Sequence, residues 1–333
     1  MSNREIICRA ERWPLSQPFR ISRGTKTLAE VVVVEIRAAG RLGRGEGVPY
    51  SRYGESLESV VAQVEQVRPA LEGGLGRSDL LSALAPGAAR NAIDCALWDL
   101  EAQRSGRSVS EIIGRAVPAA VTTAITVSLD HPETMAAAAS RVCNAPLIKI
   151  KVDANRPRGA IEAVARAAPR ARLIVDPNES WSFELLRELQ PFLAHWRVAL
   201  VEQPLPATLD DQLKGFVPLV PLCADESLHT AGDLERIVGR YQVINIKLDK
   251  TGGLTEALNL RDAARARGLG VMVGCMVCTS LGIAPALQLA ADADFLDLDG
   301  PWWLLKDRPN GVRIEGGTLR MSPTFLWGNP RES

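Results

Sequence analysis

Two lysines lie two positions apart in an otherwise apolar run, LIKIKVD, at residues 147–153. Such a run is typical of a buried strand, and side chains two apart on a strand point to the same face. Lys149 and Lys151 therefore share one face. The neighbouring charge of Lys149, together with burial, disfavours the charged form of Lys151, and a partly neutral lysine can act as a general base. The simpler alternative is a solvated edge strand whose two lysines point into water.

Carboxylates end the three apolar runs that follow: Asp176, Glu202 and Asp225. A single aspartate at the end of a strand is most often a helix N-cap or a turn residue. Three carboxylates at the same level of three successive strands repel one another unless a cation holds them. A set of oxygen ligands without histidine or cysteine suits Mg²⁺ rather than zinc. The series therefore predicts a magnesium site.

The elements that must position these residues begin near residue 120, where short apolar runs alternate with amphipathic helical stretches. Apolar strands that alternate with helices indicate parallel βα units. Eight such runs predict an α/β fold with a (β/α)7β barrel of the TIM type. The competing doubly wound sheet needs a glycine-rich turn after its first strand, and TVSLDHPET is not one.

The residues before the barrel predict a small α+β capping domain. REIICRAERWPL and EVVVVEIRAAG are typical of antiparallel strands, and two helical patterns follow them. We expect the capping domain at 1–117, the barrel at 118–305 and a C-terminal segment at 306–333. The motif GVRIEGGTLRM in that last segment predicts a hairpin that returns to the first domain.

In a barrel the strand ends that carry these charges form the active-site face. Strands two and six lie opposite each other, so Lys151 and Lys247 are expected to face each other across the mouth. A substrate carboxylate bound to the metal would place its α-carbon between the two amines. That arrangement suits removal of a proton from one face and its return to the other, while the metal stabilises the enediolate.

Composition and charge exclude several classes of protein. Lys and Arg number 39, as do Asp and Glu, so nothing favours a nucleic-acid or acidic-membrane partner. No signal-peptide core and no apolar run of membrane-spanning length is present, which predicts a cytoplasmic protein. The cysteines are expected to stay reduced, and the motif Cys275-x-x-Cys278 lacks the further ligands of a zinc site.

These motifs resemble the enolase superfamily, in its muconate-lactonizing-enzyme subgroup, over essentially the whole chain. The resemblance rests on the Lys-x-Lys motif and on four residues of the strands that follow: Asp176, Glu202, Asp225 and Lys247. It also includes ARNAIDCALWDL in the capping domain. It implies a Mg²⁺-dependent enzyme in which Lys151 and Lys247 are the acid/base catalysts and Lys149 tunes Lys151.

Within that subgroup the chain looks most like the dipeptide epimerases, in particular those that act on L-Ala-D/L-Glu. In that group an Asp-x-Asp motif on the last barrel strand binds the ammonium of the dipeptide, and Asp297 and Asp299 match it. The physical interpretation agrees, because two carboxylates away from the metal trio need a cation of their own. The resemblance implies interconversion of L-Ala-D-Glu, from peptidoglycan turnover, with L-Ala-L-Glu.

The resemblance also implies that capping-domain loops at 20–27 and 49–56 close over the barrel and help to set side-chain preference. Arg23 matches the position that would meet a glutamate side chain, although a flexible surface arginine is an equal alternative. Further candidates for substrate contact are Thr126, Cys275 and Met276. Asn178 and Glu226 are expected only to support the metal ligands, and Pro177 departs from the small residue expected after Asp176.

Three rival functions remain open from the sequence. An N-acylamino acid racemase or an o-succinylbenzoate synthase would use the same lysines and metal, but its substrate brings no ammonium for Asp297 and Asp299. A Schiff-base lyase would use one lysine as a nucleophile and would not need the carboxylates. A barrel that only binds a ligand would not need the pair of lysines. The expected partner is a small dipeptide, and the sequence leaves a homo-oligomer open.

Overall fold

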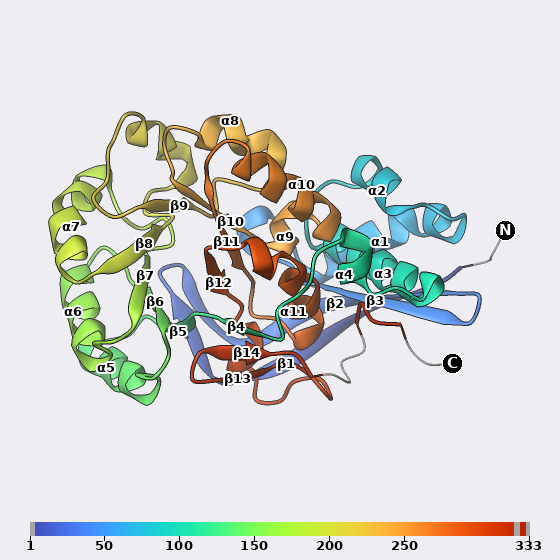
Figure 1. The fold of residues 1–333 in the computed structure, drawn as a ribbon, viewed down its shortest axis with the longest axis horizontal. Coiled ribbons are helices and arrows are strands. Elements are labelled where there is room, and N and C mark those ends of the chain that lie inside the picture. The colour runs from blue at the N-terminus through green and yellow to red at the C-terminus, as the bar shows by residue number, and fades with distance from the viewer. Residues whose placement is uncertain (1–3, 323–326, 331–333) are drawn as a thin grey trace.

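The computed structural model describes residues 4–322 and 327–330. An N-terminal domain of sheet and helices packs against a larger domain in which eight parallel strands curl into a barrel (Figure 1). The predicted combination of a TIM-type barrel with an α+β capping domain is confirmed. None of the helices in the described residues is long and apolar enough to cross a membrane.

The N-terminal sheet has three antiparallel strands in the order β1 (Glu5–Ile21), β2 (Gly24–Ala38) and β3 (Arg41–Gly47). The run VVVV at 31–34 is fully buried on both faces of this sheet. Val32 and Val34 belong to the core of the capping domain, whereas Val31 and Val33 join the core that the barrel shares. Burial on both faces explains why this strand has a continuous apolar run rather than an alternating one.

The helices of the capping domain are η1 (Ser51–Tyr53), α1 (Leu57–Glu72), α2 (Arg77–Ala83), α3 (Ala88–Ser105) and α4 (Val109–Ile113). Ser56 caps α1 by accepting a hydrogen bond from the backbone of Ser59. Helix α3 lies directly on the backbone of β3. A Cβ atom at Gly45 would come within 2.1 Å of the carbonyl oxygen of Ala92, so this close approach requires glycine.

The barrel strands run in chain order around the sheet, so each strand pairs with its neighbours in the sequence. They are β5 (Ile125–Val127), β6 (Leu147–Lys151), β7 (Arg172–Asp176), β8 (Val198–Glu202), β9 (Leu222–Ala224), β10 (Val243–Ile246), β11 (Gly270–Gly274) and β12 (Phe295–Asp297). A hydrogen bond of 2.8 Å from the amide of Ala124 to the carbonyl of Leu296 links the first and last strands.

Helical segments connect the strands on the outside of the barrel (Figure 1). They are α5 (Pro132–Arg141), α6 (Pro157–Ala167), α7 (Phe183–His195), η2 (Ala207–Leu213), η3 (Ala231–Asp233), α8 (Leu234–Ile237), α9 (Leu248–Thr251), α10 (Leu254–Arg265), α11 (Ser280–Ala286), η4 (Leu287–Asp292) and, after the last strand, η5 (Gly300–Trp303). The connection after β8 is only a 3₁₀ segment, so the alternation of strands and α-helices is weakest there.

The C-terminal hairpin differs from its expected position. Strands β13 (Arg313–Glu315) and β14 (Thr318–Arg320) pair with β4 (Ala120–Thr122), which immediately precedes the barrel, and not with the N-terminal sheet. Leu319 is buried there in the core that the barrel shares. The C-terminal segment contacts the capping domain on either side of the hairpin: Arg308 pairs with Glu11 at 2.6 Å and Glu46 at 2.9 Å, and the indole of Trp327 donates to the carbonyl of Cys95 at 3.2 Å.

Candidate active site

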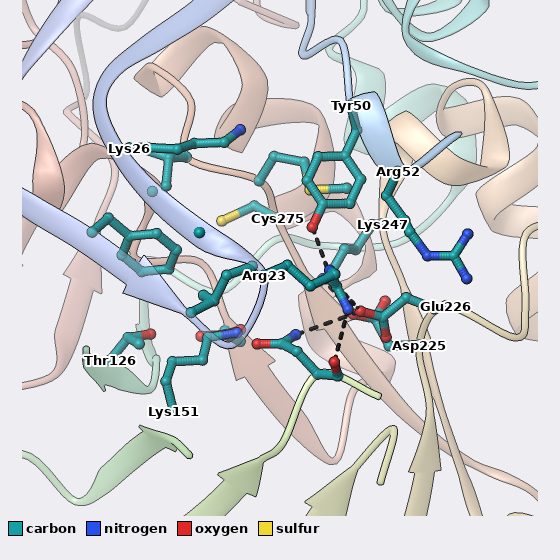
Figure 2. A pocket seen from close by; sticks show the side chains of 18 of the residues that line it. Arg23, Lys26, Tyr50, Arg52, Thr126, Lys151, Asp225, Glu226, Lys247 and Cys275 are labelled. Atoms are coloured by element: carbon teal, nitrogen blue, oxygen red, sulfur yellow. Dashed lines mark hydrogen bonds and ion pairs between the residues drawn. The ribbon is translucent and has the colours of Figure 1, made fainter. Parts of the chain in front are cut away.

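A cavity of about 420 Å³ lies between the mouth of the barrel and the loops of the capping domain. Its floor is formed by the ends of barrel strands, including Lys149, Lys151 and Asp297. Its other walls are the tip of the β1–β2 hairpin and the loop around η1 (Figure 2). Residues from both domains therefore enclose one site, as is common where ligands bind between domains.

The three lysines reach this cavity from two strands. Strand β6 lies between β5 and β7 with all five residues buried, so the alternative of a solvated edge strand is wrong. Lys149 and Lys151 share its inner face. Lys247 follows β10, which is separated from β6 by β7, β8 and β9. The three carboxylate-bearing strands thus lie between the strands of Lys151 and Lys247.

Asp176, Glu202 and Asp225 are completely buried, and each contacts a lysine. Lys151 Nζ donates to Asp176 Oδ2 at 2.6 Å, and Lys247 Nζ donates to Asp225 Oδ2 at 2.6 Å. Lys149 Nζ lies 2.7 Å from Glu202 Oε2 and 3.0 Å from Asp176 Oδ2. The two outer carboxylates therefore each hold one of the proposed acid/base lysines.

The electrostatics of this cluster require compensating positive charge. Burial raises the pKa of Glu202 to about 8, and the neighbouring charges of Asp176 and Asp225 act in the same direction. For Asp176 burial also acts upward, but Lys151 and Lys149 outweigh it and lower the pKa to about 2. The pKa values of these two carboxylates are thus shifted in opposite directions, because three buried anions cannot all ionise without cations.

Lys149 is surrounded by acidic groups rather than facing only Lys151. Burial alone would lower its pKa, but the charges of Asp297, Glu202 and Asp176 together raise the pKa well above its ordinary value. In this geometry Lys149 therefore stays charged. Its ammonium supplies positive charge at the centre of the cluster, within 3.0 Å of Asp176, Glu202 and Asp297.

The donor set fits a hard divalent cation, because it consists of carboxylate oxygens alone. Glu202 Oε2 and Asp225 Oδ1 are buried without a well-formed hydrogen bond, although a lysine ammonium lies 2.7 Å from each. Within residues 4–322 and 327–330 no three acidic, histidine or cysteine side chains are already gathered to hold a metal. Each carboxylate of the cluster instead lies within 2.7 Å of a lysine ammonium.

Asp297 and Asp299 line the same cavity from the end of β12. Asp297 Oδ2 lies 2.7 Å from Lys149 Nζ, whereas its Oδ1 is buried without a hydrogen bond. Asp299 Oδ2 accepts hydrogen bonds from the amide of Thr126 and the indole of Trp303. Burial and the charge of Asp297 raise the pKa of Asp299 to about 6. A bound cation would stabilise the ionised form of this pair of carboxylates.

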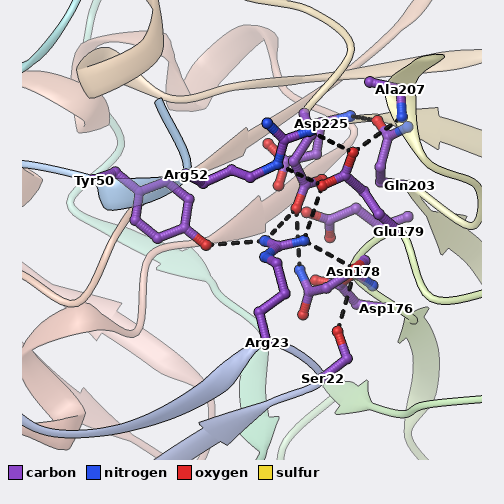
Figure 3. Close-up of polar contacts among 12 residues, drawn as sticks. Ser22, Arg23, Tyr50, Arg52, Asp176, Asn178, Glu179, Gln203, Ala207 and Asp225 are labelled. Carbon is purple, nitrogen blue, oxygen red and sulfur yellow. Dashed lines mark hydrogen bonds and ion pairs between the residues drawn. The ribbon is translucent and has the colours of Figure 1, made fainter. Parts of the chain in front are cut away.

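Arg23 is held in place by several partners at the tip of the β1–β2 hairpin (Figure 3). Its guanidinium donates to Glu226 Oε1 at 2.6 Å, to the Tyr50 hydroxyl at 2.9 Å and to the carbonyl of Asn178 at 2.9 Å. It also donates to Glu179 Oε2 at 3.1 Å. The predicted contact with a substrate side chain would therefore compete with contacts that Arg23 already makes.

Glu179 ties both capping-domain loops to the barrel (Figure 3). Arg52 donates two hydrogen bonds of 2.9 Å to its carboxylate, in addition to the bond from Arg23. The amide of Ala207 donates a further bond of 3.0 Å. We call Arg23, Arg52, Glu179 and Glu226 the latch, because their ion pairs join the two capping-domain loops to the barrel.

Thr126, Cys275 and Met276 also line the cavity, where the sequence placed them. The backbone amide of Asn178 donates to Asp176 Oδ1 at 2.9 Å, so Asn178 helps to hold this carboxylate in place. Pro177 follows Asp176 directly, and Asp176 keeps its contacts with Lys149 and Lys151.

Two residues that support the carboxylates were not predicted from the sequence. Asn245 Nδ2 donates to Glu202 Oε1 at 2.8 Å, and Lys250 Nζ lies 2.7 Å from Asp225 Oδ1. A signal for Asn245 was present, because it lies two residues before Lys247 and shares its strand face. Lys250 gave no such signal, because an exposed helix residue fits the same position.

The fold and the site together define a barrel enzyme with a capping domain, whose acidic and basic residues converge at the carboxyl ends of the strands. The chain belongs to the mandelate racemase / muconate lactonizing enzyme family of the enolase superfamily. The model of the N-terminal domain of that family matches residues 3–114. The model described as enolase C-terminal domain-like matches residues 133–323.

Two curated relatives cover nearly the whole chain. An L-Ala-D/L-Glu epimerase of Escherichia coli (strain K12) is 49% identical over 313 residues, which are 93% of this chain and 98% of the relative. An N-acetyl-D-glutamate racemase of a Pseudoalteromonas species is 43% identical over 305 residues, which are 91% of this chain and 96% of the relative.

Solved structures agree with these matches. An enolase family member from Agrobacterium tumefaciens, described as homologous to dipeptide epimerases and bound to sodium and L-Ala-L-Glu, has a TM-score of 0.94 and 45% identity. The match covers 98% of this chain and all of that one. A dipeptide epimerase from Enterococcus faecalis complexed with Mg and L-Leu-L-Tyr has a TM-score of 0.90 and 30% identity, with coverages of 96% and 97%.

Proposed function

We propose that this protein is a Mg²⁺-dependent dipeptide epimerase that inverts the α-carbon of the C-terminal residue. Its substrate is L-Ala-D-Glu, interconverted with L-Ala-L-Glu. The observation that carries the proposal is the placement of Lys151 and Lys247. Each contacts an outer carboxylate of one cluster, and the three strands of that cluster lie between their own strands. A relative with 49% identity that is an L-Ala-D/L-Glu epimerase supports it.

The two lysines act on opposite faces of the substrate α-carbon. One removes the α-proton as a general base while the other, protonated, returns a proton on the opposite face. The starting epimer decides which lysine does which. Mg²⁺, held by Asp176, Glu202 and Asp225, would stabilise the negative charge that develops on the substrate carboxylate. Lys149 adds a fixed positive charge beside the same carboxylate.

Asp297 and Asp299 hold the ammonium of the N-terminal residue. The unpaired Oδ1 of Asp297 and the raised pKa of Asp299, about 6, both indicate a pair of carboxylates that needs a cation. Binding the ammonium at one end and the α-carboxylate at the other fixes the dipeptide across the cavity. The α-carbon is thereby placed between the two lysines, and this orientation accounts for much of the rate enhancement.

A second candidate is an N-acylamino acid racemase, which the relative that acts on N-acetyl-D-glutamate favours. Such a substrate presents the same α-carboxylate and α-proton to the lysines. It brings no ammonium, however, and would leave Asp297 Oδ1 buried without a partner. An unpaired buried polar atom costs free energy, so this site favours the dipeptide.

Proton NMR in D₂O tests the two candidates together. We expect the purified protein with Mg²⁺ to remove the Glu α-proton signal of L-Ala-L-Glu and to produce resonances of L-Ala-D-Glu. A parallel reaction with N-acetyl-L-glutamate measures the second candidate. Exchange of the N-acetyl substrate alone, with no exchange across a dipeptide library, would replace the proposed function with the second candidate.

Two further tests address the remaining rivals and the place of the reaction. Borohydride would trap a covalent adduct only if a lysine formed a Schiff base, and we expect none. EDTA should abolish turnover, and added Mg²⁺ should restore it. We propose that the protein acts in the cytoplasm on dipeptides from peptidoglycan turnover, and fractionation of the native protein tests that location.

A further inference from the structure

The cavity contains six cationic side chains, and five of them already have a carboxylate partner. These pairs are Arg23 with Glu226, Arg52 with Glu179, Lys149 with Asp297, Lys151 with Asp176, and Lys247 with Asp225. The sixth is Lys26, which lines the cavity. Among the residues that the structure describes, no carboxylate oxygen lies within 4 Å of its ammonium. Lys26 is therefore the cavity cation left to pair with a ligand.

The position of Lys26 is fixed by the β1–β2 hairpin. It lies directly opposite Phe19 in the antiparallel register, and cross-strand partners project from the same face of a sheet. Phe19 lies against the catalytic floor, with its ring centroid 6.0 Å from Lys151 Nζ. Lys26 therefore projects from the same face of the hairpin as Phe19. Its ammonium lies 5.3 Å from the centre of the Tyr50 ring (Figure 2).

The substrate side chain has one direction left in which to extend. The α-carboxylate occupies the floor near the acidic cluster, and the ammonium occupies the end with Asp297 and Asp299. The two remaining positions of the α-carbon, the proton and the side chain, face the lysines and the capping loops. A glutamate side chain that extends towards these loops would bring a second carboxylate into the part of the cavity that Lys26 lines.

Arg23 is a poorer partner for that carboxylate, because the latch is electrically balanced. Two arginines, Arg23 and Arg52, face two carboxylates, Glu179 and Glu226, through ion pairs of 2.6–3.1 Å. Recruiting Arg23 to a substrate would leave Glu226, which is buried, without its cation. Removing one partner of a buried ion pair costs free energy, because the other charge stays buried without compensation. Lys26 incurs no such loss.

We propose that Lys26 is the residue that selects an acidic side chain on the C-terminal residue of the substrate, while Arg23 positions the hairpin over the barrel. This rests on the proposed function and names its preferred substrate class: dipeptides ending in glutamate. The environment of the ammonium is consistent, since desolvation lowers the pKa of Lys26 and the charges of Glu30 and Asp249 oppose this only in part. A bound carboxylate favours the charged lysine.

The test compares two substrates that differ in one charge, L-Ala-L-Glu and L-Ala-L-Gln. We expect Lys26→Met to lower kcat/KM for the glutamate dipeptide by about 10- to 100-fold, as for the loss of a charge-assisted hydrogen bond. Turnover of the glutamine dipeptide should stay within about twofold, since a neutral side chain does not need the cation. Lys26→Arg should restore most of the preference. Lys214→Met, an exposed lysine outside the cavity, is the matched control.

Arg23→Met separates the two roles. Because Arg23 holds the hairpin, its loss should weaken both dipeptides by a similar factor. The proposal is overturned if Lys26→Met affects both substrates equally, or if Arg23→Met is the variant that removes only the glutamate preference. Should the wild type act on no dipeptide, the same variants are compared on N-acetylglutamate and N-acetylglutamine. Absence of dipeptide turnover would then count against the proposed function alone, whereas the comparison of N-acetylglutamate with N-acetylglutamine would still test the role of Lys26.

Discussion

Lys149 on β6 and Asp297 on β12 form an ion pair of 2.7 Å at the mouth of the barrel. Through this contact the acidic cluster of Asp176, Glu202 and Asp225 is joined to the Asp297–Asp299 pair, so that one lysine serves both. One oxygen of Asp297 is thereby occupied and the other is left without a hydrogen bond. Under the proposed function, this free oxygen is the one that accepts from the substrate ammonium.

Removing the Asp297–Asp299 charges should therefore affect dipeptides and spare N-acyl substrates. The double variant Asp297→Asn/Asp299→Asn is expected to lower kcat/KM for L-Ala-L-Glu by at least about 100-fold, because two charge-assisted contacts are lost. Residual exchange of N-acetylglutamate, if the wild type shows any, should change little. The reactions are followed by loss of the α-proton in D₂O, and equal losses for both substrates would contradict an ammonium site.

The two-base arrangement predicts that a variant of either lysine loses epimerisation but still exchanges the α-proton of one epimer. Lys151→Ala and Lys247→Ala should each lower epimerisation by about 100-fold or more, as for the loss of a general acid/base. Each variant should still exchange the α-proton of one epimer with solvent, because the remaining lysine can remove and return a proton on its own face. Proton NMR with L-Ala-L-Glu and L-Ala-D-Glu as separate substrates measures this. Retention of exchange on the same epimer in both variants would refute the opposed placement.

Asn245 is expected to act through Glu202, which it holds by a hydrogen bond of 2.8 Å. Asn245→Ala should lower Mg²⁺ affinity by about 10- to 100-fold, as for other partners that orient a metal ligand. Isothermal titration calorimetry with MgCl₂ alone measures the affinity without reference to turnover. Asn259→Ala removes an exposed asparagine of α10 and is the control. An unchanged affinity in Asn245→Ala would show that Glu202 needs no such support.

Asp94 joins the capping helix α3 to α10, and its carboxylate accepts hydrogen bonds from the amide and hydroxyl of Thr255. Burial raises its pKa to about 6 from an ordinary value of 3.8, while those hydrogen bonds act in the opposite direction. Between these values the folded protein binds more protons than the unfolded one. The stability due to this group is therefore fully present below about pH 3.8 and lost as the pH rises through about 6.

Asp94→Asn removes this titration and keeps an oxygen that can accept from Thr255. As the pH rises from 4 to 7, the wild type should lose up to about 3 kcal/mol of unfolding free energy relative to the variant, since each pKa unit corresponds to about 1.4 kcal/mol. Urea denaturation at several pH values measures the difference. A difference that does not vary with pH, or that varies in the opposite direction, would show that Asp94 ionises normally in the fold.

Much of the site could be predicted because it follows local rules. The spacing of Lys149 and Lys151 placed both on one strand face, and the apolar runs placed the three carboxylates at the ends of successive strands. The barrel followed from the alternation of strands and helices, and its prediction is confirmed. The hairpin at 313–320 could be predicted as a hairpin, but its partner β4 could not, since an edge strand does not specify its neighbour in sequence.

The sequence by itself determined which groups are present and at which level of the barrel they lie, because strand period and connection order are local properties of the chain. Only the tertiary structure decided which charges are paired. Arg23 and Lys26 lie three residues apart in the sequence, and only Arg23 was predicted from it as a partner of a substrate. In the described part of the chain, the fold brings Glu226 and Glu179 to Arg23 but no carboxylate oxygen within 4 Å of the Lys26 ammonium. That difference arises because Coulomb interactions depend on distances in space, which a linear sequence does not contain.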